Sequence, residues 1–244
     1  MPPRRIAAIA CSWNPNRYAA TEERGALSAN AERGTKVDST KVSIKDDTFS
    51  KQIRVTANRK EYPLLDLHSL SLRDYLRQST SGNHAQVDAL FSTLDLTASV
   101  PLGRFLAAHR AGFAAMHGAM RDANGLVSEG MLLEMISALD QDLACLSTPA
   151  PSLSIDPVGP DAIDHIVLGS RLGTAVLKRH WSTATDPRVR AASRYFSLPG
   201  QAPLWRAHTD RLTSCAATGP DAERLVTDTK RLYRLFERAF HHVA

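Results

Sequence analysis

The chain has 244 residues, 43% of them hydrophobic, which is enough to bury a core in one large domain or two small ones. No apolar run approaches the roughly 20 residues that a membrane-spanning helix needs, so no membrane span is predicted. The net charge of +5 arises within residues 1–63, which hold 12 Lys and Arg against 7 Asp and Glu, whereas residues 64–244 hold 18 of each. Nucleic-acid binding needs a concentrated basic patch, so the main part of the chain is not predicted to bind nucleic acid.

The three cysteines, Cys11, Cys145 and Cys215, are far apart in the sequence and form no Cys-x-x-Cys pair. This pattern predicts neither a disulfide framework nor a structural zinc site. The first eleven residues place two arginines before a short apolar run, but that run breaks at residues 12–15 and makes a poor secretory signal. A cytoplasmic location is therefore predicted.

Residues 1–63 contain few apolar residues in any periodic pattern and are rich in Ser, Thr and charged side chains. Such a segment cannot bury enough apolar surface to offset the entropy of ordering it, which predicts a largely disordered extension. A non-native segment translated from a misplaced start has the same composition, and the sequence leaves both interpretations open. Residues 64–244 are predicted to form one folded domain.

From residue 66 onward, apolar residues recur at helical spacing, and no stretch has the alternation of a convincing strand. Ser69 or Ser71 is predicted to cap the first helix and Ser128 the third, prolines begin most of the others, and Gly, Pro and Asp residues separate the segments. The predicted helices are, in chain order, 72–91, 101–122, 128–146, 160–185, 187–195, 202–217 and 220–242. The predicted fold class is therefore all-α, with several helices packed on one core.

The helix predicted from residue 160 carries two interior glycines, Gly169 and Gly173, four residues apart and thus on one face. Each glycine costs about 1 kcal/mol relative to alanine inside a helix. Together they leave a strip of backbone without side chains, which we call the glycine strip. Such a strip favours either close packing of another helix or a planar ligand lying on the backbone.

His84 falls on the apolar face of the first predicted helix, where an imidazole is costly to bury without a partner. Asp88 follows one turn later on the same face. Metal-bound histidines usually donate their second ring N–H to a carboxylate or carbonyl, and this pair has the spacing to do so. Arg77 lies two turns before His84 on roughly the same face and is a candidate contact for an anionic ligand edge. The alternative is a core histidine satisfied by its neighbour, beside a solvated arginine.

These residues also carry a family resemblance. The segment Leu76–Asp88 resembles the proximal-helix motif of haem oxygenases, Leu-Arg/Lys-x-x-Thr-x-x-x-His-x-x-x-Glu/Asp. Gly169–Leu177 is similar to the distal-helix Gly-Ser-x-Leu-Gly of bacterial members, and the later segments resemble those members too, especially the ones associated with bacteriophytochromes. Weaker similarities follow at 195–197, 204–206 and 236–238. The resemblance covers about residues 70–240. It is fairly specific because both main motifs occur in the right order, about 85 residues apart.

The resemblance implies a single multi-helical domain that holds haem between a proximal and a distal helix. It makes His84 the axial ligand of the haem iron and Asp88 the partner of that ligand. It places Arg77 near the haem propionates. A late arginine is expected there too, and either Arg206, the candidate carried forward, or Arg211 could make this contact.

On the distal side, the resemblance makes Gly169 and Gly173 the glycines that let the helix backbone approach haem. Ser170 takes a position that supports a distal water network in the family. The implied reaction cleaves haem, which is both cofactor and substrate, with O₂ to biliverdin, CO and ferrous iron. Electrons would come from an external reductase or ferredoxin, since the chain has no nucleotide-binding fingerprint of its own. A bacteriophytochrome is a possible acceptor of biliverdin.

Three positions depart from the bacterial pattern. His165 and Leu168 stand where many members have Tyr and Glu, and Thr174 replaces a second glycine. These changes leave the predicted axial ligand and both main glycines in place, but they alter the surroundings of the distal helix. Two alternatives therefore stay open: a haem-binding protein for storage or sensing on the same fold, and a helical interaction module without haem.

Overall fold

The computed structural model describes residues 70–120 and 126–243, and within them all regular structure is helical apart from two isolated β-bridges. The predicted extension at 1–63 lies outside the described residues. The helices are α2 (Leu72–Phe91), α3 (Ser99–Gly118), α4 (Glu129–Leu146), α5 (Pro160–Trp181), α6 (Pro187–Ala191), α7 (Arg194–Ser197), α8 (Ala202–Ser214) and α9 (Pro220–His242). The all-α prediction is confirmed.

The helix boundaries follow the local sequence signals closely at α2 and α9. The hydroxyl oxygen of Ser71 accepts a hydrogen bond from the backbone N–H of Asp74 at 3.1 Å and caps α2. Of the two predicted candidates, Ser69 and Ser71, the cap is therefore Ser71. Helix α9 runs from Pro220 to His242 as predicted. Helices α3 and α8 end a few residues before their predicted ends.

The single helix predicted at 187–195 is wrong, because the structure divides it into α6 and α7. The cause lies in another helix. The carboxylate of Asp142 in α4 accepts the backbone N–H groups of Arg194 and Tyr195, at 2.9 and 2.8 Å. These two N–H groups belong to the start of α7, so Asp142 stabilises a second helix N-terminus there.

Two other buried aspartates stabilise helix N-termini in the same way. Asp164 in α5 accepts the N–H groups of Val127 and Ser128 at the start of α4, at 3.3 and 3.0 Å. Asp228 in α9 accepts the N–H of Gly159, which precedes α5, at 2.9 Å. The predicted cap of α4 by the Ser128 side chain is wrong, since that side chain makes no capping hydrogen bond. Desolvation by burial raises the pKa of both Asp142 and Asp164. The hydrogen bonds that these carboxylates accept lower the pKa and so oppose that shift.

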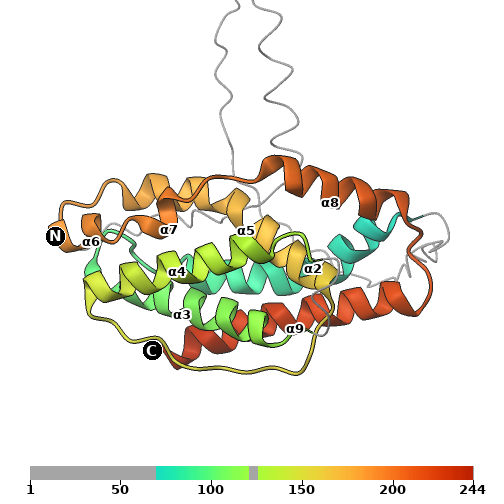
Figure 1. Cartoon of the computed structure of the whole chain (residues 1–244), viewed down its shortest axis with the longest axis horizontal. Coiled ribbons are helices and arrows are strands. Elements are labelled where there is room, and N and C mark those ends of the chain that lie inside the picture. The colour runs from blue at the N-terminus through green and yellow to red at the C-terminus, as the bar shows by residue number, and fades with distance from the viewer. Residues whose placement is uncertain (1–69, 121–125, 244) are drawn as a thin grey trace, which may run out of the picture. The chain divides into compact units, whose positions relative to one another are not determined.

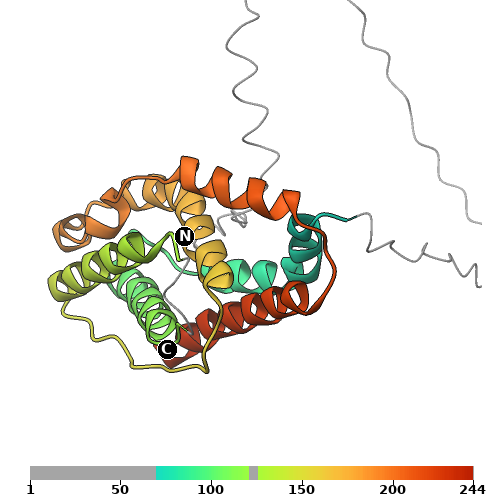
Figure 2. The same ribbon diagram turned by 45° about the vertical axis from the view of Figure 1, so that its right-hand side comes forward.

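Helix α9 packs against α2, α3 and α5, while α4 packs mainly on α3. Figures 1 and 2 both place α2 and α5 between α8 on one side and α9 on the other. The core between the helices is rich in buried aromatic and leucine side chains, among them Phe105, Phe113 and Tyr195. Gly112 of α3 allows a close approach to α9, since a Cβ there would lie 2.7 Å from the ring of Phe236. Of the helices described, none is both long and apolar enough to cross a membrane.

Candidate functional site

The predicted pair in α2 is formed. Nδ1 of His84 lies 2.9 Å from Oδ2 of Asp88, and both side chains are 27% exposed. Because α2 is regular from Leu72 to Phe91, the four-residue spacing stacks the two side chains one turn apart. The Asp88 carboxylate accepts a hydrogen bond from Nδ1–H of His84. This hydrogen bond fixes the ring tautomer and leaves the lone pair of the ring on Nε2.

Tyr233 of α9 packs beside this pair, and sequence reasoning did not identify it. Its ring meets the ring of His84 edge-on, with centroids 5.6 Å apart and planes at 80°. Desolvation by burial raises the pKa of Tyr233, and the nearby charge of Asp88 raises it further. Tyr233 therefore stays neutral and acts as an apolar wall for His84. Only the amphipathic pattern of α9 could have indicated a core position there.

Helices α2 and α5 share packing partners: both pack against α8 and α9. Charges on α2 also affect a buried histidine of α5. His165 of α5 is buried, and burial lowers its pKa to about 3, with further lowering by the charges of His208, His84 and Arg73. His84 and Arg73 of α2 therefore lie near enough to His165 of α5 for their charges to lower its pKa.

The two glycines of the strip have different surroundings. A Cβ placed on Gly173 would meet no atom of the described residues within 4 Å, so the backbone there faces open space within this part of the chain. A Cβ on Gly169 would lie 3.4 Å from Cζ3 of Trp205, so the indole of α8 already covers that part of the strip. Sequence reasoning included Trp205 only as a weak similarity and did not place it at the site.

Ser170 and Thr174 use their hydroxyl protons within α5. Ser170 Oγ donates to the carbonyl oxygen of Val167 at 2.8 Å, and Thr174 Oγ1 donates to that of Ser170 at 3.0 Å. Thr174 is buried, so its side chain does not fill the open space at Gly173. The threonine that replaces a second glycine therefore leaves that part of the strip uncovered.

His165 and His208 form an aromatic group with Trp205. The His165 ring centroid lies 5.3 Å from that of Trp205 and 5.6 Å from that of His208. Burial lowers the pKa of His208 to about 4, and the charge of Arg211 lowers it further. Both imidazoles are therefore neutral near pH 7. The sequence indicated only one member of this aromatic group, through the histidine at position 165 where many haem oxygenases have tyrosine.

The predicted propionate contacts are solvent-facing. Arg77 is exposed and lies 3.4 Å from Asp74, one turn earlier in α2. Arg206 is exposed on α8, next to the buried Trp205. Arg211 is engaged with Asp161 at the start of α5, which leaves Arg206 as the better candidate of the two late arginines.

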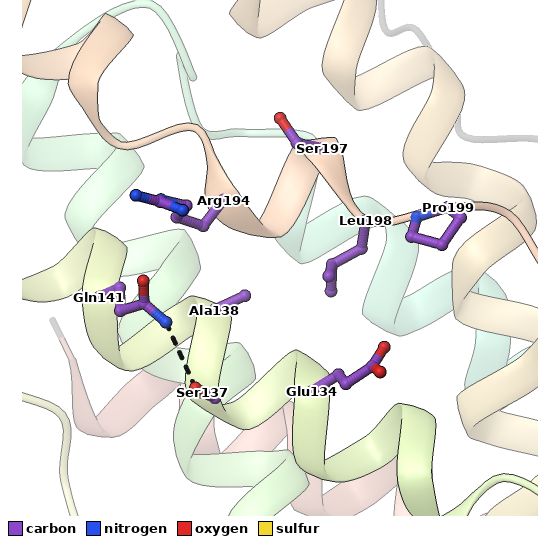
Figure 3. A pocket seen from close by; sticks show the side chains of 8 residues that line it. All are labelled: Glu134, Ser137, Ala138, Gln141, Arg194, Ser197, Leu198 and Pro199. Atoms are coloured by element: carbon purple, nitrogen blue, oxygen red, sulfur yellow. Dashed lines mark hydrogen bonds between the residues drawn. The ribbon is translucent and has the colours of Figure 1, made fainter.

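A separate pocket of about 350 Å³ lies between α4 and α7. Figure 3 shows a carboxylate and a guanidinium at its rim, with the amide of Gln141 donating to the hydroxyl of Ser137 at 3.3 Å. None of the predicted site residues lines it. Its lining residues are Glu134, Ser137, Ala138, Gln141, Arg194, Ser197, Leu198 and Pro199.

Comparison with known proteins bears on the fold. No protein-family model matches the chain, and no curated protein does. Among solved structures, the chain is similar to haem oxygenase from Neisseria meningitidis, determined with NO and CO bound, with a TM-score of 0.53 and 20% identity. The similarity covers 72% of this chain and 92% of that chain. The chain therefore has the haem oxygenase fold, and its function is inferred from its own residues.

Those residues fit a haem ligated by one histidine. His84 is held in the tautomer that offers Nε2 to a metal, and it lies in a half-buried position beside the apolar edge of Tyr233. On α5, the backbone at Gly173 is open to a planar group. Both features come from helices that pack against α8 and α9.

Proposed function

We propose that this protein binds haem between α2 and α5 and cleaves it oxidatively to biliverdin, CO and ferrous iron. The observation that carries the proposal is the His84–Asp88 hydrogen bond at 2.9 Å, within a chain that has the haem oxygenase fold. A histidine oriented in this way is typical of a metal ligand, and an uncovered helix backbone opposite it is suited to a flat ligand.

Each residue on α2 has a defined role in this proposal. Asp88 accepts the Nδ1 proton of His84, which keeps the ring from rotating and increases the basicity of Nε2. Tyr233 excludes water from one side of the imidazole. When bound, haem supplies an iron centre that activates O₂ and the ring that is oxidised, while a neutral histidine ligand lacks the strong electron donation of a thiolate.

The residues on α5 control the opposite side. Without a side chain at Gly173, the helix backbone can lie close to the bound ring and restrict the space for O₂. Ser170 donates its own proton to Val167, so its oxygen is left to accept a hydrogen bond from a water molecule. The serine can therefore orient a water near the strip.

Charge complementarity supports the proposed binding of the haem propionates by arginines. Arg77 on α2 and Arg206 on α8 are exposed cations on two of the helices around the site. Arg73 lies one turn before Arg77, and its charge reaches His165. Arginine forms bidentate hydrogen bonds with carboxylates, so this group suits the two propionates.

The reaction consumes electrons, and we propose that they come from a separate reductase or ferredoxin. A bacteriophytochrome or another biliverdin-binding protein is the proposed acceptor of the product. Both proposals rest on the sequence resemblance to bacterial haem oxygenases. They place the protein in the cytoplasm, where such donors operate.

A single titration tests the proposal. Haem is added to the purified full chain, the absorption spectrum is recorded, and a reductant is then supplied in air with catalase present. We expect a Soret band typical of histidine ligation that decays into the broad red absorption of biliverdin. Catalase removes free peroxide, so a green product formed in its presence reflects enzymatic turnover. The absence of a Soret band would contradict haem binding altogether and favour a helical interaction module.

One observation favours the non-catalytic alternative, in which the protein stores or senses haem. Trp205 covers Gly169, so only the Gly173 part of the strip is open. If Trp205 stays in place when haem binds, the distal face has less room for O₂. A stable Soret band with no biliverdin under the conditions above would support this alternative and contradict the enzyme.

A further inference from the structure

Arg171 places a guanidinium inside the protein, and no carboxylate among the described residues pairs with it. Its side chain is 5% exposed. Nη2 donates to the carbonyl oxygen of Leu198 at 2.8 Å, Nη1 donates to Thr174 Oγ1 at 3.3 Å, and the group lies 5.2 Å from the centroid of the Tyr195 ring. Nε is buried without a hydrogen-bond partner in the described part of the chain. All of these partners are neutral. A buried charge without an opposite charge is costly, so this arginine requires an explanation.

The position of Arg171 in α5 supplies one. The first half of the helix is anchored by seven consecutive buried residues, 162–168. From Gly169 to Trp181, the buried side chains are those of Arg171 and Thr174. Glycines at 169 and 173 weaken this half of the helix further. The Arg171–Leu198 hydrogen bond is therefore the polar attachment nearest to the two glycines, while Trp181 at the end of the helix donates from Nε1 to the carbonyl oxygen of Val189 at 3.0 Å.

The attachment point is itself well fixed. Leu198 directly follows α7, whose N-terminal N–H groups are held by the buried carboxylate of Asp142. Phe196 of α7 is buried and stacks on Trp181 at the end of α5, with centroids 5.5 Å apart. The 195–198 segment can thus serve as a rigid support for the glycine-bearing half of α5.

We propose that Arg171 is a positioning residue that holds the glycine strip at a fixed distance from bound haem. This inference rests on the proposed function. Arg171 is two residues from each glycine, which at about 100° per residue directs its side chain to the opposite side of α5 from the strip. It acts from behind the helix, through Leu198 and Thr174, without touching haem. Its planar fork presents two N–H groups to the two oxygens in a fixed geometry, which the point-like ammonium of a lysine does not provide.

The first test uses the haem-free full chain and hydrogen exchange of the amides at 169–177. We expect Arg171→Gln to exchange at least about tenfold faster there, because a hydrogen bond from a charged group is lost. Arg171→Lys keeps the charge and should show a smaller increase. Thr174→Val removes one of the two acceptors and should show the smallest. Arg179→Gln, at an exposed arginine of the same helix, is the matched control and should leave the rates unchanged.

The second test uses the haem complexes of the same variants. We expect an unchanged ferric Soret band, because His84 is intact, but a broadened or split C–O stretching band in the CO complex of Arg171→Gln. Such splitting reports more than one position of the distal helix. We also expect a mixture of biliverdin isomers where the wild type forms mainly one. A purely structural loss would lower all activities equally and would leave the isomer ratio unchanged.

Several outcomes would overturn the proposal. Wild-type exchange rates in both Arg171 variants would show that the side chain does not hold α5. Faster exchange with an unchanged CO band would show that it does not position the distal surface. If Arg171→Gln fails to fold, the same measurements on the milder variants Arg171→Lys and Thr174→Val decide whether the proposal holds. If the wild type binds no haem, the proposed function fails, and the exchange rates alone still decide whether Arg171 anchors this half of α5.

Discussion

The two helices that face the candidate site are held in different ways. In α2, the important contacts are internal: His84 bonds to Asp88 one turn later, and the buried hydroxyl of Thr80 donates to the carbonyl oxygen of Leu76 one turn earlier. Each of these contacts joins residues four apart. Helix α2 therefore carries its ligand geometry within one stretch of sequence.

In α5, the important contacts reach other helices. Asp164 caps the start of α4, Arg171 bonds to Leu198 after α7, and Gly169 lies under Trp205 of α8. These partners are 27 to 37 residues away in the sequence. The site therefore combines a locally specified ligand helix with a distal helix whose position depends on tertiary structure. Substitutions should separate the two.

The largest effect is expected at His84. His84→Ala should weaken haem binding by more than about a hundredfold, since it removes the ligand itself, whereas Asp88→Ala should weaken it about 10- to 100-fold. Spectral titration of haem measures both. Added imidazole should partly restore the Soret band in His84→Ala by occupying the vacated space. A wild-type spectrum and turnover in that variant would refute the assignment of the ligand.

The next largest effect is a difference in the free energy of unfolding between variants of α5 and of α2. Asp164→Ala should lower the free energy of unfolding by about 2 kcal/mol, because it leaves two N–H groups at the start of α4 without their buried acceptor. Asp88→Ala should cost about 0.5 kcal/mol or less, as expected for a pair within one helix.

Urea unfolding of the two haem-free variants compares these costs directly. Asp164→Asn serves as the control, since one amide oxygen can still accept, and its loss should be intermediate. Equal losses in the two alanine variants would contradict a difference between α2 and α5.

Acid should weaken the packing around α5. Burial lowers the folded-state pKa of His208 to about 4, from an ordinary value of 6.5. Between these values the unfolded state binds the proton and the folded state does not, so stability present at pH 7 is lost as the pH falls from 6.5 toward 4.

His208 alone should contribute about 1.4 kcal/mol of this loss per pH unit. His208→Leu, which has a similar volume, should reduce the slope of stability against pH by that amount while changing little at pH 7. Thermal unfolding at pH 7, 6, 5.5 and 5 measures the slope. An unchanged slope would mean that His208 is already protonated in the folded protein.

The smallest effect distinguishes the two glycines. Gly173→Ala should stabilise the haem-free protein by up to about 1 kcal/mol, since the added methyl meets nothing, and should raise Tm by about 2–4 °C. The same methyl should reduce haem turnover by filling the site. Gly169→Ala should stabilise less, because its Cβ would press on the Trp205 ring, and Gly169→Leu should both destabilise the protein and block the distal face.

Opposite effects on stability and turnover at Gly173 would show that the glycine is kept for ligand access. If Gly173→Ala instead destabilises the haem-free protein, the strip is used for packing and the comparison between the two glycines fails.

The sequence by itself determined the fold class, the extents of α2 and α9, and the His84–Asp88 pair. All of these depend on spacing within a few residues: a serine cap before α2, a proline at the start of α9, and a four-residue step along one helix. Local geometry of this kind is the same wherever the helix lies in the fold, so periodicity was sufficient to predict it.

Only the tertiary structure decided the division between α6 and α7, the cap of α4, the cover of Gly169 by Trp205, and the burial of Arg171. Each depends on which side chain of one helix faces which backbone group of another, dozens of residues away. Hydrophobic periodicity identifies the face that a helix buries but not the partner that covers it. For α5, that partner decides which part of the glycine strip stays open to a ligand.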